Sequence, residues 1–138
     1  TLSENDNERK KVVDAFSQFN EPVYLHQVVA KKKDGKLLLY PDMPLALADA
    51  NNKEVVEWRA HYHVPLFIDS YGVLESTQKD IETVLGIHEV DPLTFHLEIE
   101  TYTWEVLPQE MRLPLSESIC RELEWVVGIL KHEPAEKD

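Results

Sequence analysis

The stretch Glu57–Phe67 (EWRAHYHVPLF) constrains the fold more than any other part of the sequence. Its even positions from 58 to 66 are all apolar, whereas the opposite face carries Arg59, His61 and His63. This period of two residues predicts a β-strand with one face against a core and one polar face. His61 and His63 would lie roughly 6.6 Å apart along that face. Two imidazoles at this spacing can converge on one ion or one anionic ligand.

A second stretch, 95–104, has the same design. Apolar side chains at positions 95, 97 and 99 alternate with His96, Glu98 and Glu100. If the two strands are parallel neighbours, their polar faces lie side by side, and in a closed barrel this shared face is the interior. Ligand sites in such barrels lie at the C-terminal ends of the strands. His63 and Glu100, the later residues of each pair, are therefore expected nearest a site.

His61 and Glu98 are expected one layer deeper, where a buried Arg59 would neutralise the carboxylate. Neutral imidazoles and carboxylates suit a divalent transition metal such as Zn, Mn, Fe or Co. The same groups can also act as an acid/base pair without a metal. The alternative is a buried His–Glu–Arg network that only satisfies its own hydrogen bonds. Because burying so many polar side chains without a ligand is costly, we favour a site.

The remaining periodic segments predict four helices and one hairpin. Asp34 and Gly35 between two apolar runs are typical of a hairpin turn. Thr77 followed by Asp80 predicts the N-terminal cap of a helix that ends at Gly86. Strands that alternate with helices predict βαβ units and a parallel sheet. The expected helices are 8–19, 45–50, 77–86 and 115–130, and the expected hairpin strands are 23–31 and 36–40.

Three single residues are assigned structural roles. His26, inside the first hairpin strand, is expected to be hydrogen-bonded and structural, and His88 is expected to be exposed in a loop. Cys120 has no nucleophile signature around it and is expected to be a buried thiol in the last helix. The predicted buried stripe of that helix is Leu115, Ile119, Leu123, Val126, Val127 and Leu130.

Composition restricts the partners. A net charge of −12 over 138 residues disfavours nucleic-acid phosphates and anionic membranes. The apolar runs are too short for a transmembrane helix, so we expect no membrane insertion. A single cysteine suits a reducing compartment, which predicts a cytoplasmic protein. Exposed sheet edges favour a homo-oligomer.

The length suits a single domain spanning residues 1–138. The start at Thr1 instead of Met leads us to expect an excised segment of a longer protein. The polar ends, 1–8 and 132–138, are expected to be flexible.

Six blocks of the sequence together resemble the C-terminal part of the EboE-like metabolite-traffic proteins, a branch of the xylose-isomerase-like TIM-barrel superfamily. They cover most of residues 21–126 in order. The blocks are EPVYLHQVVA (21–30), LYPDMPLAL (39–47), EWRAHYHVPLF (57–67), LESTQKDIETVL (74–85), HLEIETYTWEVLP (96–108) and LSESICRELEWV (115–126).

This resemblance implies an α/β fold, namely the C-terminal segment of a (β/α)₈ barrel with a β-hairpin elaboration and an incomplete barrel in this chain. It implies a cytoplasmic bacterial protein that handles a small sugar-like or polyol-like metabolite in traffic or export. In the full-length parent it implies a divalent-metal-dependent isomerase or epimerase activity. The alternatives are a non-catalytic metabolite-binding carrier and a protein-interaction module.

The site residues follow the same resemblance. The metal ligands of the seventh and eighth barrel strands map to His63 and Glu100, and Glu98, Glu100 and His61 are assigned as catalytic. The strands that would supply further ligands are absent from these residues. We therefore expect this chain alone to be inactive and to bind Mn, Zn, Fe or Co weakly or not at all.

Overall fold

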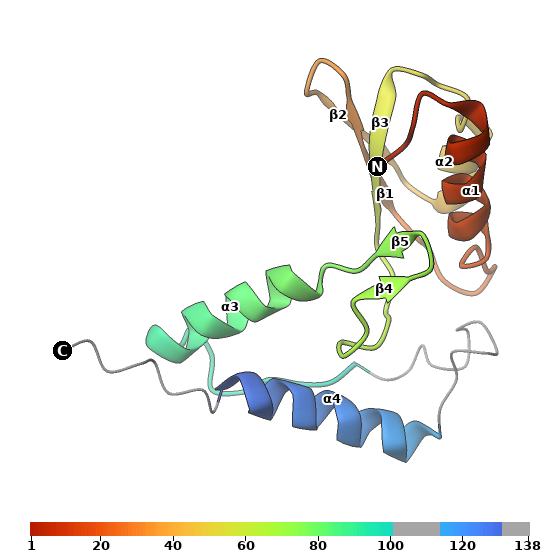
Figure 1. The fold of residues 1–138 in the computed structure, drawn as a ribbon. Helices are drawn as coiled ribbons and strands as arrows, with labels where there is room; N and C mark the ends of the chain where they lie inside the picture. The colour runs from red at the N-terminus through yellow and green to blue at the C-terminus, as the bar shows by residue number, and fades with distance from the viewer. Residues whose placement is uncertain (101–113, 131–138) are drawn as a thin grey trace. The chain divides into compact units, whose positions relative to one another are not determined.

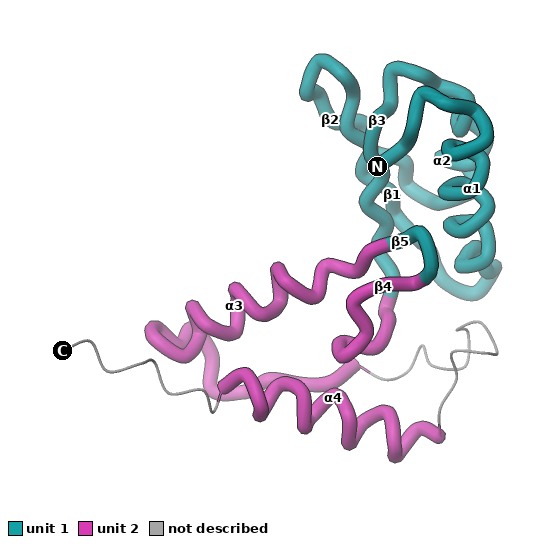
Figure 2. The backbone as a smooth tube through the Cα atoms, in the orientation of Figure 1, with its two compact units in different colours: residues 1–62, 72–74, 106–108 teal, residues 63–71, 75–105, 109–138 magenta. Residues whose placement is uncertain are grey.

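The structure is a computed structural model that describes residues 1–100 and 114–130 (Figure 1). The chain divides into two compact units (Figure 2). Among the described residues, the first unit comprises 1–62 and 72–74, and the second comprises 63–71, 75–100 and 114–130.

The first unit contains a three-stranded antiparallel sheet. Its strands are β1 (Val28–Lys32), β2 (Leu37–Tyr40) and β3 (Val55–Ala60), in the order β2-β1-β3. The predicted hairpin joins β1 to β2, and Gly35 at its turn has a φ of 82°, which favours glycine. At the β3 edge, the backbone N–H of Leu2 donates to the carbonyl of Val56 at 2.7 Å.

Two helices cover one face of this sheet, α1 (Asp6–Ser17) and α2 (Met43–Ala48) (Figure 1). Asn5 caps α1 by accepting from the N–H groups of Asn7 and Glu8. Asp42 caps α2, and a proline lies in its first turn, where the missing N–H has no partner within the helix to lose. The core between the layers is formed by Leu2, Phe16, Val28, Ala30, Tyr40, Met43, Ala46, Val55 and Trp58.

The alternation predicted for 57–67 is confirmed at two neighbouring positions of β3, because Trp58 is buried and Arg59 is exposed. The strand ends at Ala60, however, and residues 61–67 do not continue it. Pro65, which cannot donate a backbone hydrogen bond to a ladder, lies in the middle of that segment and is fully buried. The alternating pattern therefore extends further than the strand does.

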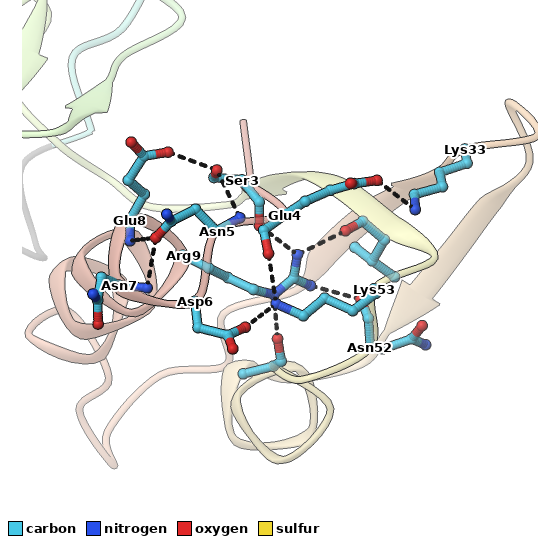
Figure 3. Close-up of polar contacts among 12 residues, drawn as sticks. Ser3, Glu4, Asn5, Asp6, Asn7, Glu8, Arg9, Lys33, Asn52 and Lys53 are labelled. Carbon is cyan, nitrogen blue, oxygen red and sulfur yellow. Dashed lines mark hydrogen bonds and ion pairs between the residues drawn. The ribbon is translucent and has the colours of Figure 1, made fainter.

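Arg9 ties the N-terminal helix to the chain before β3 (Figure 3). Its side chain is 3% exposed, and its guanidinium donates to the carbonyls of Ala50 at 2.5 Å and Asn52 at 2.6 Å. It also donates to those of Val55 at 3.1 Å and Ser3 at 3.4 Å. Burial lowers the pKa of Arg9, and the nearby carboxylates oppose that change. The single side chain of Arg9 therefore donates hydrogen bonds to four backbone carbonyls.

The second unit is mainly helical. It contains α3 (Gln78–Val90) and α4 (Leu115–Leu130), which pack against each other. A two-stranded ribbon, β4 (Ser70–Tyr71) with β5 (Leu74–Glu75), turns at Gly72, whose φ is 65°; residues 72–74 of this ribbon are assigned to the first unit. Leu85 is the buried apolar residue of α3.

Helix α3 differs from its prediction at both ends. Thr77 occupies the N-cap position as expected, but its side chain makes no capping bond, and the Ser76 hydroxyl accepts from the N–H of Gln78 instead. Gly86 does not end the helix, which continues to Val90, before Asp91 and a proline. The prediction of an exposed loop position for His88 is wrong, because the residue is half-buried in this helix.

Helix α4 has the predicted bounds but not the predicted buried face. Leu115, Leu123 and Val127 are 52%, 50% and 40% exposed, whereas Ser118 and Glu122 are buried. Cys120 is exposed, so the prediction of a buried thiol is wrong.

The predicted strand over 94–104 is wrong for its described residues, since 94–100 form no strand; 101–104 lie outside the described part of the chain. The Thr94 hydroxyl donates to the carbonyl of His96 and accepts from its N–H, and such local bonds compete with a strand ladder. Phe95, expected in a core, is 96% exposed. The fold is thus mixed α/β with small antiparallel sheets, and neither a parallel pair nor a closed barrel is formed by residues 1–100 and 114–130.

Candidate functional site

The structure brings His63 and Glu100 together. The ring Nδ1 of His63 lies 3.0 Å from Oε2 of Glu100, although the two residues are far apart in the sequence. Both belong to the second unit, and their side chains are 25% and 57% exposed. A contact between a half-buried imidazole and a more exposed carboxylate is open to solvent on one side. These are the two residues expected nearest a site, although they meet without the predicted strands.

His61 belongs to the first unit. Its backbone N–H donates to the carbonyl of Gln27 at 2.9 Å, and its ring Nδ1 lies 3.3 Å from the side-chain oxygen of the same residue. Its carbonyl oxygen is 3.3 Å from Nδ1 of His26. His61 is exposed and continues the pairing beyond the end of β3.

Glu98 and Arg59 do not form the predicted buried pair. Arg59 is exposed, and its Nε donates to Glu57 at 2.8 Å, which holds the pKa of the Glu57 carboxyl below its usual range. Glu98 is exposed in the second unit, and no hydrogen bond or ion pair joins it to another described residue. The neutralisation of Glu98 by a buried Arg59 is therefore wrong, because neither side chain is buried.

His26 is the best-enclosed imidazole of the first unit. It is 6% exposed, its Nε2 lies 3.1 Å from Oε1 of Glu21, and its ring packs against Tyr62 at 4.7 Å. Glu21 also accepts from the backbone N–H groups of Val23 and Tyr24. The predicted hydrogen-bonded state of His26 is confirmed, although the residue precedes β1 instead of lying within it.

The His63–Glu100 pair offers two metal donors. Two ligand atoms about 2.1 Å from one ion are about 3.0 Å apart in octahedral geometry and about 3.4 Å apart in tetrahedral geometry. The observed separation therefore fits a hydrogen bond or two octahedral neighbours and is short for two ligands of a tetrahedral zinc ion. Among the described residues there is no cluster of three or more His, Cys, Asp or Glu side chains that could hold an ion. Within residues 1–100 and 114–130, the pair can therefore supply part of the ligand set of a metal ion.

Glu122 is a buried carboxylate that is not part of the buried stripe predicted for α4. Its Oε1 accepts from the N–H of Leu66 at 3.1 Å, while Oε2 and the hydroxyl of Ser118 are buried without a hydrogen-bond partner among the described residues. Burial raises the pKa of Glu122. Ser118, four residues before Glu122, is also buried, which puts the two polar residues on one side of α4. The apolar period did not mark that side as buried, because Leu115, seven residues before Glu122, is itself exposed.

The backbone of Leu66 forms hydrogen bonds with one side chain from each of the two helices. Besides donating to Glu122, it accepts from the Gln78 side chain at 2.6 Å. Next to it, the ring of Phe67 lies 4.1 Å from the guanidinium carbon of Arg121. Helices α3 and α4 thus anchor the segment that follows His63.

In the described part of the chain, none of the helices combines the length and apolar character needed to cross a membrane. Comparison with protein-family models, with curated protein sequences and with solved structures gives no match to this chain.

Proposed function

We propose that the chain contributes a His–carboxylate pair, His63 with Glu100, to a site for a small sugar-like or polyol-like metabolite. The observation that carries the proposal is their 3.0 Å separation. The pair joins the two segments whose alternating polar residues first pointed to a site. The same proposal holds that this chain is part of a xylose-isomerase-like TIM barrel and that the whole protein is a cytoplasmic metabolite-traffic protein.

The chemistry of the pair is proton exchange. A carboxylate on one ring nitrogen fixes the orientation and the tautomer of an imidazole. The other ring nitrogen of His63, Nε2, would then exchange a proton with a substrate hydroxyl or an adjacent C–H. Glu98, two residues before Glu100, would be a second carboxylate on the same segment. This proton exchange is what an isomerase or epimerase requires.

A divalent metal would be held by His63 Nδ1 and Glu100 Oε2. When bound, it would polarise a substrate oxygen as a Lewis acid. If four ligands supply about 10–16 kcal/mol, two of them supply about half, which corresponds to a Kd of about 1 µM to 0.2 mM. We therefore expect weak binding by this chain and tighter binding only where further ligands are present.

A carrier without turnover is the second candidate, favoured by the 57% exposure of Glu100. An acid/base catalyst works best where water is excluded, whereas a reversible carrier needs an accessible site. The two candidates differ in one measurement. A carrier binds the metabolite without turnover, while an enzyme loses turnover in Glu100→Gln and keeps its fold.

The test is calorimetric titration with Zn²⁺ and Mn²⁺, followed by a screen of aldoses, ketoses and polyols by NMR chemical shift. His63→Ala and Glu100→Gln are expected to abolish weak metal binding and ligand-induced shifts. His96→Ala is the matched control, because His96 is exposed and its described hydrogen bonds involve only its backbone. Stoichiometric binding tighter than about 1 µM would show that the two-donor assignment is wrong. Equal binding by His63→Ala would exclude the pair altogether.

A further inference from the structure

The two edges of the three-stranded sheet in the first unit differ. At the β3 edge, the backbone N–H of Leu2 donates to the carbonyl of Val56, and the Leu2 side chain is buried in the core. At the opposite edge, β2 pairs with β1 on one side, and no described strand pairs with its other side. Because an unpaired edge is a template for a further strand, β2 is where the sheet of the first unit can be extended.

The register of the hairpin shows which backbone groups of β2 point out of this edge. The N–H of Lys32 donates to the carbonyl of Lys36 at 2.9 Å, so these residues form a hydrogen-bonded pair. Along an antiparallel ladder, such pairs alternate with pairs that exchange no hydrogen bond. In the observed register the second kind includes Leu37 and Leu39. The N–H and C=O groups of these two residues therefore point away from β1.

The side chains of Leu37 and Leu39 share the face of the sheet that α1 and α2 do not cover. The two residues are two positions apart in one strand, which puts them on the same face, and they are 70% and 63% exposed. The register places Val29, which is 38% exposed, directly beside Leu39 on the neighbouring strand. The open edge thus combines outward backbone groups with a continuous apolar patch of three side chains.

We propose that β2 pairs antiparallel with β2 of a second copy of this chain, with Leu37 of each copy opposite Leu39 of the other. In this register, both residues exchange their outward N–H and C=O groups in hydrogen-bonded pairs, and the two-fold axis passes beside Leu38. Residues directly opposite each other in antiparallel strands interact on one face, so the leucines of the two copies are in contact. The same patch is used twice, which closes the assembly as a dimer.

The charges near this edge permit a second copy as the partner. Lys36 is the charged residue next to the outward pair, and it forms an ion pair with Asp34 at 2.8 Å. In the proposed register the two Lys36 residues are four positions apart along the strands, or roughly 13 Å, which exceeds the Debye length of about 8 Å at physiological salt. The described residues of the first unit include ten acidic and nine basic ones, so two such units are nearly neutral toward each other.

The first test is light scattering of the full chain over a concentration series. A contact of one short strand with another belongs to the small and weak interfaces, so we expect a dimer with a Kd of about 0.1 mM. Leu37→Lys/Leu39→Lys places like charges opposite each other and is expected to raise this Kd at least about tenfold. Leu25→Lys is the matched control, because Leu25 is 68% exposed and precedes β1, and it should leave the Kd unchanged.

A proline at position 39 provides a second variant that leaves the ladder with β1 intact. Because the N–H of Leu39 points outward, Leu39→Pro removes a donor of the proposed contact and none of the bonds to β1. It is also expected to raise the Kd at least about tenfold. Circular dichroism verifies that the variants fold, and if one of them does not, the other carries the test.

Residue-specific amide exchange tests the register itself. Raising the chain concentration from about 0.01 mM to about 1 mM, across the expected Kd, should slow exchange at Leu37 and Leu39 at least about threefold. Three results would overturn the proposal. The chain could remain monomeric at every concentration, or a dimer could persist unchanged in the folded variants. Dimerisation could also leave exchange at Leu37 and Leu39 unchanged. This inference is independent of the His63–Glu100 site.

Discussion

The two units of this chain bury different kinds of residue. The first unit closes an apolar core between a sheet and two helices, and its one deeply buried arginine has four carbonyl partners. The second unit, in its described part, buries Glu122 and Ser118 with unpaired oxygens while leucines and valines remain exposed. The first unit leaves one buried side-chain atom of this kind unpaired among the described residues, the indole Nε1 of Trp58, and it also exposes Leu37 and Leu39. The difference is therefore one of degree, because the second unit leaves a carboxylate oxygen and a hydroxyl without partners, whereas the first leaves a single neutral N–H.

Replacing Arg9 by Met is expected to have the largest effect. The four backbone carbonyls would lose the hydrogen bonds that Arg9 donates, because the Met side chain has no N–H donor. We expect the free energy of unfolding of the first unit to fall by about 3–5 kcal/mol, as measured by urea denaturation.

Lys10→Met is the control for Arg9. Lys10 is adjacent in the sequence and forms an exposed ion pair with Asp14 at 2.6 Å. Its replacement is expected to cost less than about 0.5 kcal/mol. Equal losses in the two variants would mean that the buried hydrogen bonds of Arg9 do not stabilise the unit.

A cavity-forming pair of variants compares the packing of the two units directly. Met43 is fully buried in the first unit, and Leu85 is 6% exposed in the second. Met43→Ala is expected to cost about 3 kcal/mol, within the range for truncation in a close-packed core. Leu85→Ala is expected to cost about 2 kcal/mol, the low end of that range, because a less closed environment can relax around the missing atoms.

Residue-specific amide hydrogen exchange separates the two effects, since each variant should lower protection mainly in its own unit. A loss of protection from Leu85→Ala as large as that from Met43→Ala would show that the second unit is as tightly packed as the first. That result would also weaken the contrast between the two units.

The elements that the sequence predicts correctly are those that local signals determine. The β1–β2 hairpin, the helices and the bounds of α4 follow from local signals, namely Asp34–Gly35, a proline after Asp42 and a long apolar period. Strand pairing did not follow from local signals. Antiparallel pairing of β3 with β1 depends on contacts distant in the sequence, and alternation alone does not distinguish it from a parallel pair.

The candidate site was predicted in part for the same reason. Alternation marked His63 and Glu100 as polar positions, and the structure pairs them. The alternation did not reveal that the strand ends before Pro65. It also did not reveal that the Thr94 side chain forms local hydrogen bonds with the backbone of His96. His61 lies beside Gln27 in the first unit, whereas Glu98 and Glu100 belong to the second. A pattern of side-chain types assigns faces, but backbone hydrogen bonds determine how far each strand extends.

Removing the charge of the buried Glu122 carboxyl tests the contrast between the two units with the smallest expected change in stability. Burial raises its pKa above the ordinary value of 4.5, so protonation favours the folded state. Its stabilising contribution is complete below the pKa of the unfolded chain and is lost as pH rises through the higher pKa of the folded state. Glu122→Gln keeps an oxygen acceptor for the N–H of Leu66 and removes the charge.

Glu122→Gln is therefore expected to match the wild type near pH 4 and to be about 1 kcal/mol more stable at pH 7. The measurement is amide exchange in α4 at both pH values. Glu124→Gln, an exposed neighbour on the same helix, is the control and should show no such pH-dependent difference. A wild type more stable than Glu122→Gln at pH 7 would mean that Oε2 has a partner when charged. The second unit would then leave one buried side-chain atom unpaired, the hydroxyl of Ser118, as the first leaves Nε1 of Trp58.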